Sequence, residues 1–162
     1  MPMQFRNEDI RILIIDDDEQ VRDAHRRVVA RAGYQARAAD SVRAGLDAAS
    51  EWKPDLILLD LVMPDSRGLQ SLETLRAAPA TRDAIVVAFS GVIVESDAPG
   101  YRAMGFDAII PKPVDAASLV ARIGEVLRAE RGASDGGADG DGEGQGGGGT
   151  RGGRRRERDA RD

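Results

Sequence analysis

Four short apolar runs, each followed at once by a reactive polar side chain, restrict the fold of this chain more than any other feature. They are ILIIDDD at 12–18, LILLD at 56–60, IVVAFS at 85–90 and IIPKP at 109–113. Helical patterns separate the runs, and this alternation is typical of strand–helix units around a parallel sheet. The run at 56–59 is apolar at every position, as expected for a strand that is covered on both faces.

Five strand–helix units fit between residues 10 and 130, which predicts an α/β fold. The expected strands are 12–15, 34–38, 56–59, 85–89 and 108–110. The expected helices are about 20–32, a second helix that Asp40 or Ser41 caps and that ends near Trp52, then 69–77 and 116–128. The helix after 85–89 is expected to be short or to begin late, because Pro99 and Gly100 fall in its first turn.

Composition excludes several classes of protein. The formal net charge of -5 argues against a duplex-binding surface spread over the domain, so nucleic acid is not the expected partner. The chain has no cysteine, which excludes disulfides and thiolate metal sites. No uninterrupted apolar run approaches the roughly 18 residues of a membrane-spanning helix. We therefore expect a soluble cytoplasmic protein that does not enter a membrane.

Composition also predicts the domain boundaries. Residues 1–9 are expected to be a short leader and residues 10–130 a single folded domain, because the chain changes character near Arg131. Residues 132–153 hold 12 of the 19 glycines and no large apolar side chain. We expect residues 131–162 to be a disordered tail rich in glycine and arginine, with at most weak charge contacts to nucleic acid.

The polar residues that end the four runs predict a single site. Parallel strands place their carboxyl ends at one edge of the sheet, where ligands bind in open α/β folds. The side chains expected there are those of Asp16, Asp17, Asp60, Ser90 and Lys112. Mutual repulsion disfavours clustered carboxylates unless a cation intervenes, and an oxygen-only site suits Mg²⁺ with phosphate oxygens as further ligands.

Lys112 stands out within the composition of the chain. Only Lys53 and Lys112 are lysines among 23 basic residues, and the others are arginines. A lysine supplies a compact, strongly hydrated point charge that can balance phosphoryl oxygens, whereas a hydroxyl such as that of Ser90 can donate to one of them. The site is therefore predicted to bind a phosphoryl group beside a magnesium ion.

The segment from about Arg11 to Ala129 resembles a response-regulator receiver domain, the phosphoacceptor module of two-component signalling. The matching pieces are Asp16-Asp17, the DLVMPDSRG stretch that begins at Asp60, Ser90-Gly91 and Lys112-Pro113. Each piece alone is a weak signal, but four in the right order and spacing are strong. The resemblance implies a doubly wound, flavodoxin-like fold whose five-stranded parallel sheet has the order 2-1-3-4-5.

The same resemblance implies roles for the site residues. Asp60 is expected to accept a phosphoryl group from a phosphohistidine on a sensor histidine kinase or a phosphotransfer protein. Asp17, Asp60 and the main-chain carbonyl of Val62 are expected to bind Mg²⁺, with Asp16 acting largely through water. Ser90 is expected to move toward the phosphoryl group and so to change the binding of a downstream protein target. The chain is not expected to be an enzyme.

Two other interpretations remain open from the residues. Asp16-Asp17-Asp18 also satisfies the D-x-D spacing of haloacid dehalogenase-type phosphohydrolases, in which Asp16 would be the nucleophile. A receiver-like interaction module that is never phosphorylated is the second alternative. The only histidine, His25, is expected to be an exposed residue of the first helix, since one histidine makes no metal cluster.

Overall fold

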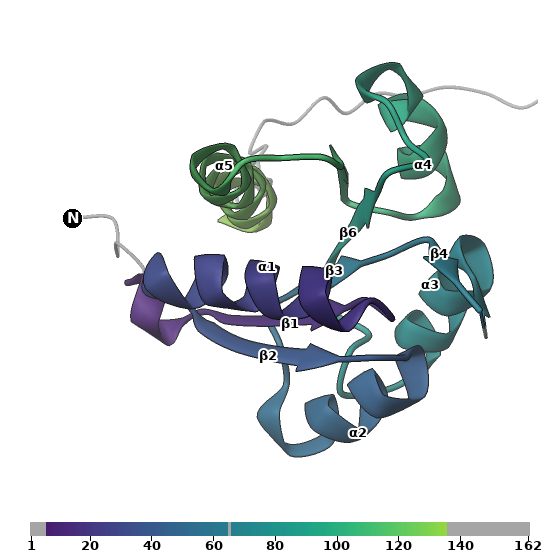
Figure 1. Cartoon of the computed structure of the whole chain (residues 1–162), viewed down its shortest axis with the longest axis horizontal. Coiled ribbons are helices and arrows are strands. Elements are labelled where there is room, and N and C mark those ends of the chain that lie inside the picture. The colour runs from purple at the N-terminus through teal and green to yellow at the C-terminus, as the bar shows by residue number, and fades with distance from the viewer. Residues whose placement is uncertain (1–5, 65, 136–162) are drawn as a thin grey trace, which may run out of the picture.

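A five-stranded parallel sheet forms the centre of the computed structural model, which describes residues 6–64 and 66–135 (Figure 1). Its strands follow the spatial order β2-β1-β3-β6-β7. Their bounds are β1 Arg11–Ile15, β2 Gln35–Ala39, β3 Leu56–Leu59, β6 Ile85–Ser90 and β7 Ala108–Pro111. The predicted order 2-1-3-4-5 is confirmed, because β6 and β7 are the fourth and fifth strands of this sheet.

Helices cover both faces of the sheet. α1 (Glu19–Arg31) and α5 (Ala116–Asp135) pack on one face, as Figure 1 shows. α2 (Val42–Trp52), α3 (Gly68–Ala77) and α4 (Ala98–Met104) pack on the other. Two 3-10 turns complete the described elements, η1 at Asn7–Asp9 and η2 at Glu95–Asp97. None of the helices in the described residues is long and apolar enough to cross a bilayer.

Two hydrophobic cores explain why the strand sequences are apolar at successive positions. In β1, Leu13 and Ile15 belong to the core under α2 and α3, whereas Ile12 and Ile14 belong to the core under α1 and α5. Successive strand side chains point to opposite faces, so a strand covered on both sides must be apolar throughout. β3 follows the same alternation, and all four of its residues are fully buried.

Local signals set the ends of α1 and α2. The Asp18 carboxylate accepts a hydrogen bond from the Val21 N–H and caps α1, and Ser41 caps α2 in the same way. α2 ends at Trp52, as predicted, and Lys53 adopts a left-handed conformation before Pro54. These caps satisfy main-chain donors that a helix leaves without partners.

Two parts of the fold differ from the expectation. A short hairpin of β4 (Val62–Met63) and β5 (Ser66–Arg67) follows β3, where no strand was predicted. α5 continues to Asp135 instead of ending near Arg128, so the expected tail boundary at residue 131 falls inside the helix. An ion pair between Arg131 and Asp55 at 3.4 Å supports this extension. The remaining part of the expected tail, 136–162, and residues 1–5 of the leader lie outside the described residues.

Candidate functional site

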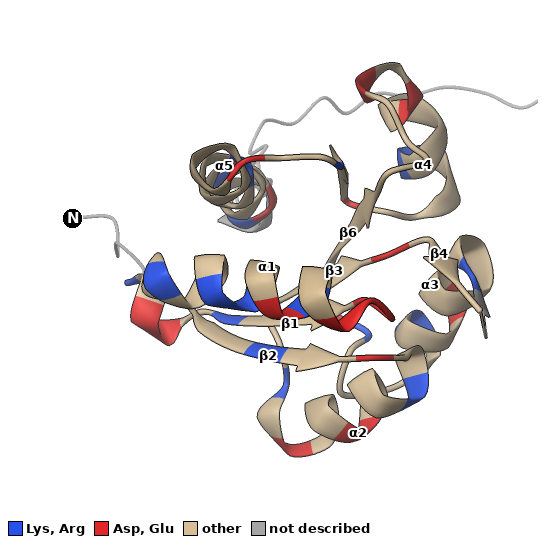
Figure 2. Cartoon of the chain, viewed as in Figure 1, with Lys and Arg blue, Asp and Glu red and all other residues tan. Residues whose placement is uncertain are grey.

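The carboxyl ends of four strands bring the predicted site residues together. Ile15 of β1 pairs with Leu59 of β3, so the aspartates that follow these residues are neighbours. On the other side of β3, Ser90 of β6 pairs with Pro111 of β7, which places Lys112 beside the end of β6. Figure 2 shows the acidic segments after β1 and β3 at the same edge of the sheet. The register of the sheet therefore builds the site.

Three carboxylates form the acidic part of the site. Asp16, Asp17 and Asp60 each present an oxygen, and these atoms lie within 4.8 Å of one another. Asp16 is only 1 % exposed and Asp60 9 %, whereas Asp17 lies at the exposed rim. Such a group of like charges with oxygen donors alone suits a hard divalent cation. The acidic cluster of Asp16, Asp17 and Asp60 thus has the donor set of a metal site.

Lys112 supplies the positive charge of the site. Its Nζ donates a hydrogen bond to Asp16 Oδ2 at 2.6 Å and lies 3.7 Å from Asp60 Oδ2. The lysine side chain is 16 % exposed, so the contact with Asp16 is largely shielded from water. An ion pair in this environment is screened by salt much less than an exposed pair.

Main-chain hydrogen bonds fix the two buried aspartates. The Asp60 N–H donates to the Ile15 carbonyl at 2.9 Å, and the Asp16 N–H donates to the Ala39 carbonyl at 3.1 Å. Asp16 Oδ1 accepts from the Asp18 N–H at 3.0 Å. Asp60 Oδ1 accepts from the Val62 N–H at 3.1 Å. Both carboxylates are therefore held by the sheet and by the residue two positions further along the chain.

Ser90 and Lys112 are joined through the main chain. The Lys112 N–H donates to the Ser90 carbonyl at 3.0 Å, so the hydroxyl and the ammonium come from adjacent strand ends. Ser90 is 1 % exposed, and the Val92 N–H lies 3.5 Å from its Oγ. The structure thus brings every predicted side chain to one edge of the sheet. Val62 follows Asp60 by two residues, and its N–H donates to Asp60 Oδ1.

The expectation that His25 is an exposed residue was wrong. This residue is half-buried on α1, and its ring packs edge-on against Phe89 with 4.7 Å between ring centroids. Burial lowers the pKa of His25, the positive charge of Lys112 lowers it further, and the negative charge of Asp16 opposes both. The sequence carried a signal for this position, because His25 lies four residues from both Val21 and Val29 on the apolar stripe of α1.

The family of the chain follows from a comparison with known proteins. The model of the response regulator receiver domain family matches residues 12–124, which include every residue of the site described above. The chain belongs to this family. Receiver domains are the phosphoacceptor modules of two-component signalling, and this places the chain among signalling proteins of that kind. The match does not favour the haloacid dehalogenase-type alternative.

Similar proteins support the assignment of this receiver domain. It is 35% identical to response regulator MprA of Mycolicibacterium vanbaalenii over 123 residues, 74% of this chain and 51% of that protein. It is 34% identical to the phosphate regulon transcriptional regulatory protein PhoB of Escherichia coli over 118 residues, 73% and 52% of the two chains. The chain spans about half the length of these curated relatives.

Solved structures agree with the fold of the receiver domain. A response regulator receiver domain protein from Methanospirillum hungatei has a TM-score of 0.66 at 27% identity, covering 76% of this chain and 98% of that one. The chemotaxis protein CheY4 of Vibrio cholerae, at 21% identity, has a TM-score of 0.66 over 73% of this chain and 98% of its own. The second likeness concerns the fold alone.

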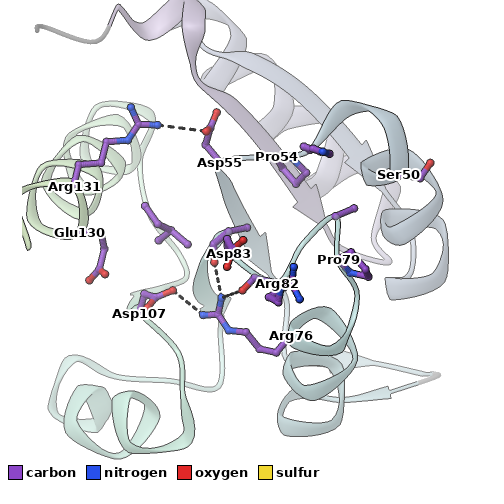
Figure 3. A pocket seen from close by; sticks show the side chains of 14 residues that line it. Ser50, Pro54, Asp55, Arg76, Pro79, Arg82, Asp83, Asp107, Glu130 and Arg131 are labelled. Atoms are coloured by element: carbon purple, nitrogen blue, oxygen red, sulfur yellow. Dashed lines mark hydrogen bonds and ion pairs between the residues drawn. The ribbon is translucent and has the colours of Figure 1, made fainter. Parts of the chain in front are cut away.

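A cavity of about 820 Å³ lies at the opposite end of the sheet from the site (Figure 3). It is lined by the ends of α2, α3 and α5 and by the beginnings of β3, β6 and β7. Arg76 forms one wall and is bound by an ion pair to Asp107 at 2.8 Å. The cavity contains none of the residues of the acidic cluster, so its chemistry is separate from that of the strand ends.

Proposed function

We propose that the receiver domain accepts a phosphoryl group on Asp60 in a Mg²⁺-dependent reaction, and that this switches the binding of a protein target. The proposal rests on a difference in hydrogen bonding between the carboxylates of the two buried aspartates, Asp16 and Asp60. Both oxygens of Asp16 are hydrogen bonded, Oδ2 to Lys112 and Oδ1 to the Asp18 N–H. Asp60 Oδ2 has only the longer 3.7 Å contact with Lys112 among the described residues, so it is the freer nucleophile.

The acidic cluster supports magnesium as the cofactor. Asp17 and Asp60 would hold the ion directly, with the main-chain carbonyl of Val62 as a third ligand. Asp16 would act through water, since its oxygens already have partners. When bound, the ion neutralises charge on the phosphoryl oxygens. Mg²⁺ suits this arrangement because it usually keeps several waters and needs only one or two carboxylates besides phosphate oxygens.

The chemistry of the chain is one group transfer. Asp60 Oδ2 attacks the phosphorus of a phosphohistidine as the bond from phosphorus to the imidazole nitrogen breaks, and the electron pair leaves with that nitrogen. Lys112 would balance the phosphoryl oxygens, and the buried Ser90 hydroxyl would donate to one of them. The product is an acyl phosphate on Asp60 itself, so the chain acts as an acceptor and not as an enzyme with turnover. A sensor histidine kinase or a phosphotransfer protein would supply the group.

Covalent labelling tests the proposed function. Incubation with acetyl phosphate and Mg²⁺ is expected to add one phosphoryl group to Asp60, which mass spectrometry of peptides can locate. Asp60→Asn is expected to abolish the label, because an amide is not a nucleophile for this transfer. Asp16→Asn is the matched control. It is expected to slow labelling, with the label still on Asp60. A label on Asp16 with continuing turnover would support the phosphohydrolase, and no magnesium-dependent label would support a non-phosphorylated module.

Magnesium binding gives a second prediction that does not depend on phosphorylation. At ten times its dissociation constant, the ion is expected to stabilise the fold by about 1.4 kcal/mol. Asp17→Asn is expected to remove most of this gain, because it deletes an exposed carboxylate of the cluster without disturbing the core. Thermal unfolding with and without Mg²⁺ measures both effects. An unchanged response of the variant would contradict the metal assignment.

A further inference from the structure

An aromatic contact to Lys112 is not explained by the proposed chemistry. The Lys112 Nζ lies 4.8 Å from the centroid of the Phe89 ring, with the ammonium over the ring. Phe89 is the residue before Ser90 and is 1 % exposed, so it belongs both to the core and to the site. A cation over an aromatic face is attracted by the ring quadrupole, most strongly where water is excluded. The ammonium is therefore held by a ring as well as by carboxylates.

His25 packs against that ring. Its imidazole packs against Phe89 with an interplanar angle of 61°, an edge-to-face arrangement. Aromatic pairs prefer this geometry, so the contact restricts the plane in which the Phe89 ring lies. His25 belongs to α1, which begins directly after the acidic residues that follow β1. His25 therefore belongs to the same stretch of chain as Asp16 and Asp17 of the acidic cluster.

His25 brings a buried polar atom into this aromatic pair. His25 Nδ1 is buried and has no hydrogen-bond partner within the described residues. Leaving a buried polar atom without a partner costs free energy that an apolar side chain of similar shape would avoid. Burial lowers the pKa of His25 and so favours the uncharged ring, which adds an aromatic plane without a charge that would repel Lys112.

We propose that His25 is a positioning residue for phosphoryl transfer. Its imidazole fixes the plane of the Phe89 ring, and that ring holds the Lys112 ammonium beside the acidic cluster. The inference rests on the proposed function, since the ammonium matters for the transfer to Asp60. His25 itself touches neither the phosphoryl group nor the metal and acts through Phe89 alone.

The small number of lysines makes a spectroscopic test direct. Lys53 and Lys112 are the only two, so a full-length chain with ¹³C-labelled lysine gives two ε-methylene signals. The Lys112 signal is expected to be displaced by the ring current of Phe89, whereas the exposed Lys53 serves as an internal reference. Replacement of Lys53 by arginine assigns the two signals.

Two substitutions of His25 separate positioning from simple packing. In His25→Leu, which keeps the volume and removes the aromatic plane, the Lys112 signal is expected to move toward that of Lys53. Labelling of Asp60 by acetyl phosphate is expected to slow by about tenfold, since small displacements of catalytic groups have effects of this size or larger. His25→Phe restores the aromatic plane and is expected to restore both the signal and the rate. Phe89→Leu is expected to reproduce the His25→Leu result from the other member of the pair.

The outcomes distinguish this inference from the proposed function. A Lys112 signal that stays in place in His25→Leu would overturn the inference, and so would an unchanged labelling rate. Failure of the wild-type chain to become labelled would instead refute phosphoryl transfer to Asp60. In that case the lysine spectra would still decide whether the aromatic pair holds the ammonium.

Discussion

Replacement of Lys112 by methionine is expected to lower the free energy of unfolding by about 3 kcal/mol, the cost of leaving a buried charge without its partner. The Lys112 ammonium is the charged partner of Asp16 Oδ2, and Asp16 is 1 % exposed. Without the ammonium, the Asp16 carboxylate also faces the negative charges of Asp17 and Asp60. Urea unfolding with a chelator present measures the change.

Two comparisons show whether this loss comes from the buried charge. Lys53→Met removes the other lysine, which is exposed, and is expected to change stability by less than about 0.5 kcal/mol. Adding Asp16→Asn to Lys112→Met is expected to recover most of the loss, because the unpaired charge is then gone. Equal stability of the Lys53→Met and Lys112→Met variants would show that the Lys112 ammonium does not compensate the negative charge of Asp16.

Replacement of Arg76 by leucine is expected to cost about 3 kcal/mol as well, because several acceptors lose a charged donor at once. The Arg76 guanidinium joins the end of α3 to the beginnings of β6 and β7, as the dashed lines in Figure 3 show in part. Its acceptors are the main-chain carbonyls of Arg82, Ala84 and Gly105 and the carboxylate of Asp107. Thermal or urea unfolding measures the effect.

The same cavity provides the control for Arg76. Arg82 is exposed at the same wall, and Arg82→Leu is expected to have a much smaller effect, since only its carbonyl takes part in the Arg76 contacts. Labelling of Asp60 is expected to proceed at the wild-type rate in both variants, because the cavity lies at the other end of the sheet. A loss of labelling in folded Arg76→Leu would contradict this separation of roles.

The strand ends could be predicted from the sequence because one pattern encodes both the core and the site. In β3, four apolar residues in succession require a strand covered on both faces, and the first polar residue after them must leave the core at the carboxyl edge. Asp60 is therefore placed by the same residues that form the core. Asp16 after β1 and Ser90 at the end of β6 are placed in the same way.

Other features depend on contacts that no local pattern records. The hairpin of β4 and β5 has strands of two residues, too short to show a period. The extension of α5 past Arg128 is supported by the ion pair of Arg131 with Asp55, which are far apart in the sequence. The residue type of His25 favours a surface position, whereas its place on the apolar stripe of α1 favours burial. The partner of Lys112 also depends on the three-dimensional fold, since the ammonium lies within reach of two carboxylates, those of Asp16 and Asp60.

Every residue of the connection between β1 and α1 has a structural role. Asp16 binds Lys112, Asp17 contributes to the acidic cluster, and Asp18 caps α1 through the Val21 N–H. Three consecutive residues thus perform three different tasks, and an inserted residue would displace at least two of them together. The length of this connection is therefore dictated by the chemistry that it carries, and not merely by the gap between a strand and a helix.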